Sequence, residues 1–191
     1  MNAEKLRSCS VLLLDADGVW FDGFEYRTAL PDGTVALSKR RDHQDGQGLS
    51  FLRAAGLRVK FVSGESQPLG SIVEKINKLP SVQNGTWAPV EASLGKNGKG
   101  DKSVAIEEWL KENSFSWSDC IYIGDDINDY HAMKKVSDAG GLAVAPANAT
   151  RRILEIADIH LKGSGGHGAL REFAEMVLDA RGLDERELPP A

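Results

Sequence analysis

The chain has 191 residues, of which 41% are hydrophobic and 27% charged, enough for one continuous core but hardly for two full domains. Its formal net charge of −5 gives no support for nucleic-acid binding, which normally shows as an excess of basic residues. The polar start MNAEKLRSCS and the short apolar run after it match neither a signal peptide nor a membrane span. We therefore expect a cytoplasmic protein.

The first half of the chain predicts two strands, a hairpin and a helix. The apolar run over residues 11–14 is typical of a central parallel strand that is covered on both faces. Residues 20–37 alternate bulky and polar side chains around Pro31-Asp32-Gly33, which predicts a projecting β-hairpin over about 20–38. A helix over 48–55 and a strand over 58–62 follow.

The second half continues the alternation of helices with strands. Pro68 opens a helix that runs to about Leu79, whereas the glycine-rich residues 84–100 predict an irregular surface loop. The remaining elements are a helix over 102–113, a strand over 120–123, a helix through Met133 and Val136, and a strand over 142–144. This order predicts an α/β fold with a parallel sheet wound on both faces and a ligand crevice at the carboxyl ends of its strands.

Two cysteines occur, Cys9 and Cys120, and they are far apart in the sequence. Each lies beside or within an apolar run. We expect two buried free thiols rather than a disulfide or a zinc site, and hence a reducing compartment.

Acidic side chains follow two of the predicted strands. Asp15 and Asp17 come directly after the first strand, and paired acids at such a place can divide two catalytic roles. Asp125 and Asp126 follow the strand over 120–123 and offer the hard oxygen ligands that magnesium prefers, and Asp129 can support that set. A carboxylate attacks phosphorus only when the charge of the phosphate is neutralised, so a cation beside Asp15 is expected.

Two further positions offer what a phosphate group needs. Ser63, followed by Gly64, presents a hydroxyl and backbone N–H groups, and Lys102 presents a fixed positive charge. Each signal alone has a plain structural explanation, because acids after strands often cap helices and a single lysine is usually solvated. Four such signals in an order that fits one phosphoryl-transfer site favour the functional interpretation. A receiver domain also pairs acids with a lysine, but it leaves Asp17 unexplained.

These motifs resemble those of the haloacid dehalogenase superfamily, in which Asp-x-Asp, Ser or Thr, Lys and an acidic motif follow one another. The opening DADGVWFDG is similar to that of the capless branch represented by 3-deoxy-D-manno-octulosonate 8-phosphate phosphatases. The likeness continues through DGQGLSFLRAAG, GDKSVAIEEWLKE, VAPANA and GGHGALREF. It implies a single Rossmann-like domain over residues 1–191 without a cap, with a tail from about 182. It also implies Mg²⁺-dependent hydrolysis of a phosphorylated 2-keto-3-deoxy sugar acid in surface-glycan (lipopolysaccharide) biosynthesis.

The resemblance also assigns roles to individual residues. It implies that Asp15 attacks phosphorus while Asp17 protonates the departing oxygen and later activates water. It implies Mg²⁺ held by Asp15, the carbonyl of Asp17 and Asp125, with Asp126 and Asp129 behind them. Members of this branch typically form tetramers through their hairpins, so a homotetramer is expected. Three aromatic residues either serve that contact or pack on the core of their own subunit: Trp20, Phe21 and Phe24.

The resemblance leaves two classes of sugar-acid substrate open. Ser63-Gly64-Glu65 stands where octulosonate phosphatases usually carry Thr-Gly-Arg, which makes the chain similar here to phosphatases of nonulosonate (KDN or N-acylneuraminate) 9-phosphates. Gln44 and His167 replace arginines of the branch, and the basic run 39–41 either meets the substrate carboxylate or is solvated. The expected substrate contacts are Ser63, Gly64, Glu65, Lys102 and His167. A catalytically silent oligomerisation module, as in domains attached to some cytidylyltransferases, is the alternative from another class.

Overall fold

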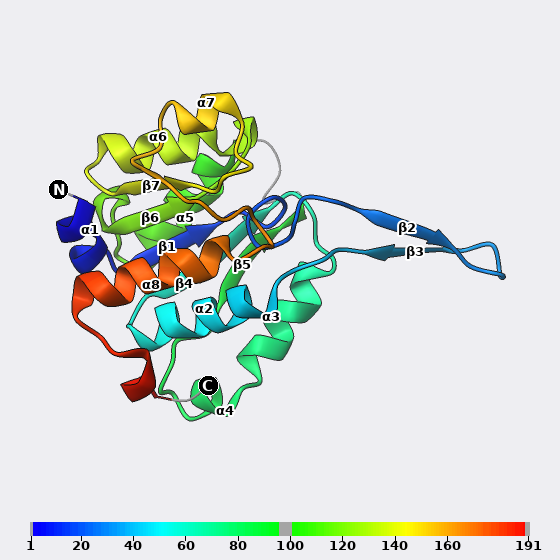
Figure 1. Cartoon of the computed structure of the whole chain (residues 1–191), viewed down its shortest axis with the longest axis horizontal. Coiled ribbons are helices and arrows are strands. Elements are labelled where there is room, and N and C mark those ends of the chain that lie inside the picture. The colour runs from blue at the N-terminus through cyan, green and yellow to red at the C-terminus, as the bar shows by residue number, and fades with distance from the viewer. Residues whose placement is uncertain (1, 96–100, 190–191) are drawn as a thin grey trace.

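Figure 1 shows a computed structural model of the chain, in which residues 2–95 and 101–189 are described. The middle layer is a parallel sheet in the order β5-β4-β1-β6-β7-β8, so β1 lies between the two strands that carry the later motifs. The strand bounds are β1 Val11–Leu14, β4 Arg58–Ser63, β5 Glu91–Leu94, β6 Cys120–Ile123, β7 Leu142–Ala145 and β8 Ile159–His160. The expected doubly wound α/β sheet is confirmed.

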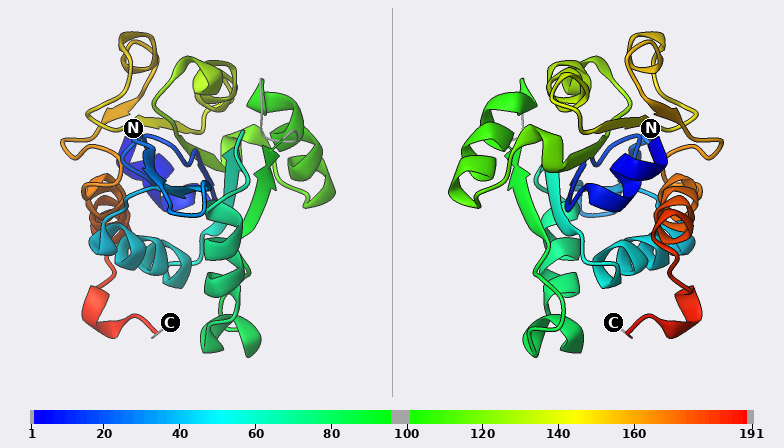
Figure 2. Two further views of the ribbon diagram at one scale, coloured as in Figure 1. Left: turned by 90° about the vertical axis from the view of Figure 1, so that its right-hand side faces the viewer. Right: turned by 90° about the vertical axis from the view of Figure 1, so that its left-hand side faces the viewer.

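Helices cover both faces of this sheet (Figures 1 and 2). They are α1 Asn2–Ser8, α2 His43–Ala54, α3 Leu69–Asn77, α4 Pro80–Gln83, α5 Lys102–Glu112, α6 Tyr130–Asp138, α7 Arg151–Leu154 and α8 Ala169–Arg181. One core cluster joins the sheet to α1, α2, α3 and α8, and a second joins the opposite face to α5, α6 and α7. The chain thus has the three layers expected from its sequence.

The sequence of strand β1 explains its place in the middle of a sheet that is covered on both faces. Its side chains alternate between the two clusters, with Leu12 and Leu14 in the first and Val11 and Leu13 in the second. All four residues are fully buried. A strand that is apolar at every position can satisfy both of its faces only in the middle of a covered sheet.

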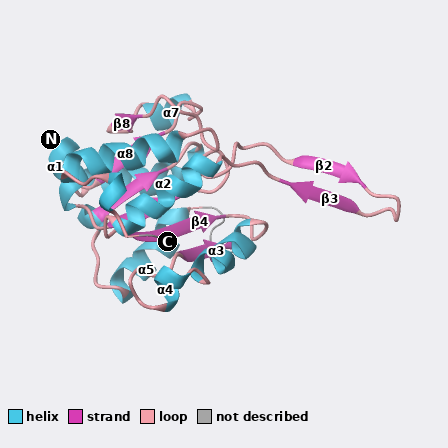
Figure 3. Ribbon diagram, turned by 60° about the horizontal axis from the view of Figure 1, so that its bottom comes forward, coloured by secondary structure: helices cyan, strands magenta, loops and turns pink. Residues whose placement is uncertain are grey.

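The hairpin consists of β2 (Tyr26–Ala29) and β3 (Val35–Ser38), which pair antiparallel and extend away from the sheet (Figures 1 and 3). Trp20 and Phe21 lie before it and are buried in the core of their own subunit. Of the three aromatic residues considered, Phe24 alone is exposed, at 67%. The hairpin itself exposes further large apolar side chains, namely Tyr26, Leu30, Val35 and Leu37.

The expectation of an irregular loop over residues 84–100 was wrong for its middle part. Residues 91–94 form β5, the edge strand that pairs with β4, and residues 96–100 lie outside the described part. Each residue of β5 is half-buried, and an edge strand needs pairing on one side alone. Its sequence, EASL, therefore lacks the apolar run that revealed β1 and β6.

Helix α8 was also missed, and it closes the fold against α2. The buried carboxylate of Asp45 on α2 accepts hydrogen bonds from Gly168 N (3.0 Å) and Arg171 N (2.9 Å) at the start of α8. A Cβ at Gly48 would lie 2.9 Å from Arg171 Cα, so glycine permits the close approach of the two helices. Cys9 and Cys120 are buried and free, as expected.

Candidate active site

A cavity of about 440 Å³ opens where β1, β4 and β6 end. Its lining residues are Asp15, Asp17, Gly18, Gly23, Ser63, Gly64, Glu65, Asp125, Asp126 and Asn128. The carboxyl ends of neighbouring parallel strands meet at one edge of a sheet, which is why motifs far apart in the sequence come together here. Five of these lining residues carry carboxylates, so the cavity strongly favours a cation.

Asp15 lies at the tip of β1 and contacts Lys102, the first residue of α5. Lys102 Nζ is 2.6 Å from Asp15 Oδ1, and the lysine side chain is 1% exposed. Asp15 Oδ1 also accepts a hydrogen bond from Ala16 N at 2.6 Å. Burial and the nearby Asp129 raise the pKa of Asp15 although Lys102 opposes them. The carboxylate form therefore depends on further positive charge in the cavity.

Asp129 is fully buried, and hydrogen bonds reach both oxygens of its carboxylate. Oδ1 accepts hydrogen bonds from Lys102 Nζ and from the hydroxyl of Tyr122, both at 2.8 Å. Oδ2 accepts from the backbone N–H groups of Asp125 (3.0 Å) and Asp126 (3.3 Å). Asp129 thereby holds the lysine on one side and the turn after β6 on the other. The burial of Lys102 lowers its pKa, but Asp129 and Asp15 outweigh this and raise it.

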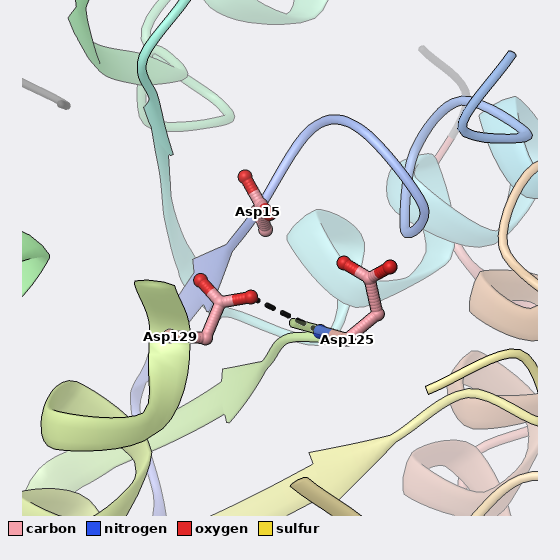
Figure 4. A group of neighbouring side chains, drawn as sticks. All are labelled: Asp15, Asp125 and Asp129. Carbon is pink, nitrogen blue, oxygen red and sulfur yellow. Dashed lines mark hydrogen bonds between the residues drawn. The ribbon is translucent and has the colours of Figure 1, made fainter. Parts of the chain in front are cut away.

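Asp125 is the residue of this group whose charge is least satisfied. Its Oδ1 is buried and has no hydrogen-bond partner among residues 2–95 and 101–189. Burial, with the nearby charges of Asp129 and Asp126, raises the pKa of Asp125 to about 7. One carboxylate oxygen each of Asp15, Asp125 and Asp129 lie within 4.8 Å of one another, and Figure 4 shows the three side chains together.

These observations fit a bound metal ion. A buried carboxylate oxygen without a donor is costly unless a cation meets it, and hard oxygen ligands suit Mg²⁺ and similar ions. Asp15 and Asp125 are the carboxylates available for such an ion, because Asp129 already accepts four hydrogen bonds.

Asp17, Ser63 and Glu65 line the other side of the cavity. Ser63 is 2% exposed, and its Oγ accepts a hydrogen bond from Glu65 N at 3.2 Å. Lys39, which follows β3, has its Nζ 2.5 Å from Asp17 Oδ1 and 2.5 Å from Glu65 Oε2. The sequence did not predict a contact between this lysine and the two acids.

The loop after Asp15 packs so closely that two glycines are required. A Cβ at Gly18, where φ is +81°, would lie 1.9 Å from Asp125 Oδ2. A Cβ at Gly165 would lie 1.9 Å from Gly18 O. Asn148 ties the three segments together, because its side chain donates to Gly18 O (2.9 Å) and accepts from Gly165 N (2.7 Å). The motif VAPANA, which contains Asn148, thus supports the site, although sequence reasoning gave that residue no role.

Two expected site residues differ in their relation to the cavity. His167 is not among the lining residues of the cavity, and its Nδ1 lies 3.2 Å from Arg40 Nη2. Asp126 lines the cavity and also begins the turn over 127–129, where its side chain accepts from Ile127 N. Its expected support of the metal stays a prediction.

The model of haloacid dehalogenase-like hydrolases matches residues 59–171, which is more than half of the chain. The chain belongs to this family. It is 29% identical over 182 residues to the 3-deoxy-D-manno-octulosonate 8-phosphate phosphatase of Escherichia coli, covering 95% of this chain and 86% of that protein. Relatives with this name are phosphatases, and the chain is a phosphoric monoester hydrolase.

Solved structures agree with this placement. A probable phosphatase from Pseudomonas syringae is 29% identical with a TM-score of 0.73, covering 96% of this chain and 93% of that one. The cobalt-bound deoxy-D-mannose-octulosonate 8-phosphate phosphatase of Haemophilus influenzae is 28% identical with a TM-score of 0.72, covering 93% and 92%. Among the described residues, we find no helix of the length and apolar character that crossing a bilayer requires.

Proposed function

We propose that the chain is a Mg²⁺-dependent phosphatase that acts on a phosphorylated 2-keto-3-deoxy sugar acid, of the octulosonate 8-phosphate type, by way of an aspartyl-phosphate on Asp15. One observation carries this proposal. Asp15 and Lys102 contact each other at the edge of a cavity where Asp125 offers a buried oxygen that has no hydrogen-bond partner among the described residues. The likeness to the Escherichia coli octulosonate phosphatase over 95% of the chain supports the substrate class.

Asp15 Oδ1 is held by Lys102 and by Ala16 N, so Oδ2 is the oxygen left to attack phosphorus. Asp17 lies two residues further on and gives a proton to the sugar oxygen as the new bond from Asp15 Oδ2 to phosphorus forms and the P–O bond to the sugar breaks. The same carboxylate then takes a proton from the water that hydrolyses the aspartyl-phosphate, and both Asp15 and Asp17 return to their starting states. Ser63 and Lys102 contribute donors for the phosphoryl oxygens.

Asp15, the carbonyl of Asp17 and Asp125 would hold the Mg²⁺, with Asp126 and Asp129 behind them. The ion supplies positive charge that ionises the two carboxylates and offsets the charge of the phosphate. The cobalt-bound relative from Haemophilus influenzae supports a bound metal ion as part of this proposal.

A nonulosonate 9-phosphate is the second candidate substrate, and Glu65 is the observation that favours it. Glu65 lines the cavity and stands where the octulosonate branch usually carries a cation. A carboxylate at this place can accept hydrogen bonds from hydroxyls of a longer sugar chain. The expected substrate contact of His167, whose Nδ1 lies 3.2 Å from Arg40 Nη2, belongs to this proposal.

A homotetramer and a cytoplasmic location belong to the same proposal. The hairpin exposes Val35 and Leu37 at 56% and 60%, and Phe24, just before it, is exposed at 67%. Exposed apolar side chains gathered in one part of the chain mark a contact surface. The resemblance to capless phosphatases supports association through these hairpins.

The experiment is a substrate panel with released phosphate measured, run with Mg²⁺ and with EDTA. We expect turnover of octulosonate 8-phosphate in preference to the nine-carbon esters, loss with EDTA, and a fall of several orders of magnitude in Asp15→Asn. The amide cannot form an acyl phosphate. A preference for a nonulosonate 9-phosphate would select the second candidate. Absence of phosphate release from every ester, including an aryl phosphate, would support the silent oligomerisation module.

A further inference from the structure

Lys39 joins two loops of the cavity through a single ammonium group. It lies at the base of the hairpin, directly after β3, and its Nζ is 2.5 Å from both Asp17 Oδ1 and Glu65 Oε2. The side chain of Lys39 is 7% exposed, whereas those of Asp17 and Glu65 are 36% and 55% exposed. The cation is therefore better sheltered from solvent than either of its partners.

Contacts of the neighbouring chain hold the backbone of Lys39 in place. Asp22 N donates a hydrogen bond to Arg40 O at 3.0 Å. This bond attaches the segment after β3 to the loop that follows Asp17. The ammonium also lies 5.8 Å from the centre of the buried ring of Phe21.

Asp17 depends on this lysine for its orientation. Within residues 2–95 and 101–189, Lys39 is the sole side chain that hydrogen-bonds the Asp17 carboxylate. With Oδ1 bound to the ammonium, Oδ2 is the oxygen left to pass a proton to the departing group and later to take one from water. A carboxyl group that turns freely would present that oxygen only part of the time.

We propose that Lys39 is a positioning residue, which holds the Asp17 carboxyl group in the orientation needed for proton transfer to the leaving oxygen. This inference rests on the proposed phosphatase function. It differs from a merely structural role in one measurable way. A lost proton donor slows the departure of a basic leaving group far more than that of a weakly basic one, which leaves readily as an anion. A general loss of structure slows both equally.

The test uses a series of substituted phenyl phosphates that differ in the basicity of the phenol released. These esters lack the sugar, so contacts of Glu65 with hydroxyls do not enter the comparison. The quantity compared is kcat/KM, because it reports the steps up to formation of the aspartyl-phosphate and excludes its hydrolysis. Wild type, Lys39→Met, Lys39→Arg and Asp17→Asn are measured at saturating Mg²⁺. Lys134→Met, which removes an exposed lysine from a surface pair with Asp138 on α6, is the matched control.

We expect Lys39→Met to lose about tenfold or more in kcat/KM on phenyl phosphate and less than about threefold on 4-nitrophenyl phosphate. Its dependence on leaving-group basicity should approach that of Asp17→Asn, and Lys39→Arg should restore much of the wild-type dependence. Lys134→Met should match wild type. Glu65→Gln leaves the hydrogen bond between Lys39 and Asp17 in place, so the dependence of kcat/KM on leaving-group basicity should not change.

Equal losses along the series in Lys39→Met, or no loss at all, would overturn the inference while leaving the phosphatase proposal intact. The same holds if Glu65→Gln reproduces the change, because Lys39 would then act through Glu65. If Lys39→Met does not fold by circular dichroism, Lys39→Gln replaces it with the same criterion, and Lys39→Arg stays the variant that should retain the wild-type dependence. A wild-type chain that hydrolyses neither this series nor the sugar-acid esters of the substrate panel removes the proposed function and this inference with it.

Discussion

The metal-free protein should lose stability as the pH rises towards neutrality, because Asp125 is costly to ionise in the folded state. Its pKa is about 7 in the folded chain and 3.8 as a free side chain. Between these values the folded state binds more protons than the unfolded state, so the free energy of unfolding falls with increasing pH. A difference of roughly 3 pH units corresponds to at most about 4 kcal/mol. Asp15, whose pKa is also raised, acts in the same direction.

This loss of stability is measured by urea unfolding in EDTA at several pH values between about 4.5 and 7.5. The range lies roughly between the two pKa values of Asp125. Asp125→Asn is the matched variant, because the amide keeps the shape of the side chain and does not ionise. We expect the free energy of unfolding to fall by several kcal/mol in wild type and clearly less in the variant. At neutral pH, Mg²⁺ at about 100 times its Kd should return about 3 kcal/mol to wild type and little to Asp125→Asn.

The test is the difference between wild type and Asp125→Asn in how the free energy of unfolding changes with pH. Groups remote from Asp125 contribute equally in wild type and variant, so their contribution cancels in the difference. An equally steep fall in Asp125→Asn would refute the reasoning, as would a wild-type stability that rises from pH 5 to 7. Either result would mean that the unpartnered oxygen of Asp125 is already compensated without a metal.

Two further predictions concern packing. Gly165→Ala should destabilise the chain by more than about 3 kcal/mol in urea unfolding and reduce turnover, because the new Cβ meets Gly18 O. Gly33→Ala, at a turn with φ +82° and open space around it, should cost only about 1 kcal/mol, and an equal cost at both positions would contradict the close packing. Cys9 and Cys120 should resist a thiol reagent in the native chain and react in urea, because burial raises the pKa of both thiols. Rapid native labelling of Cys120 would contradict its burial.

The sequence predicted the parts of the fold whose burial is complete. β1 and β6 are apolar at every position, and the acids that follow them meet as expected in one cavity. β5 was missed because it lies at the edge of the sheet, where half-buried positions tolerate polar residues. For α8 the signal was present, since Leu170, Phe173 and Val177 recur at helical spacing, but the segment was considered only as a motif.

The basic run 39–41 marks the limit of sequence reasoning at the site. Its three members are chemically alike, yet Lys39 contacts Asp17 and Glu65, Arg40 lies beside His167, and Arg41 lies over the ring of Trp20. These contacts depend on how the hairpin returns to the sheet, and no local pattern records that path. The long-range contacts of Asn148 were hidden for the same reason.

The bond between Asp22 N and Arg40 O has a consequence for how this enzyme could be altered. The chain leaves the domain at Asp22 and returns at Arg40, so this hydrogen bond closes the base of the segment between them. Its length and apolar content could change, through engineering or drift, without disturbing the sheet. Such changes would alter the exposed apolar surface that the hairpin presents, while Lys39, next to Arg40, would keep its contact with Asp17.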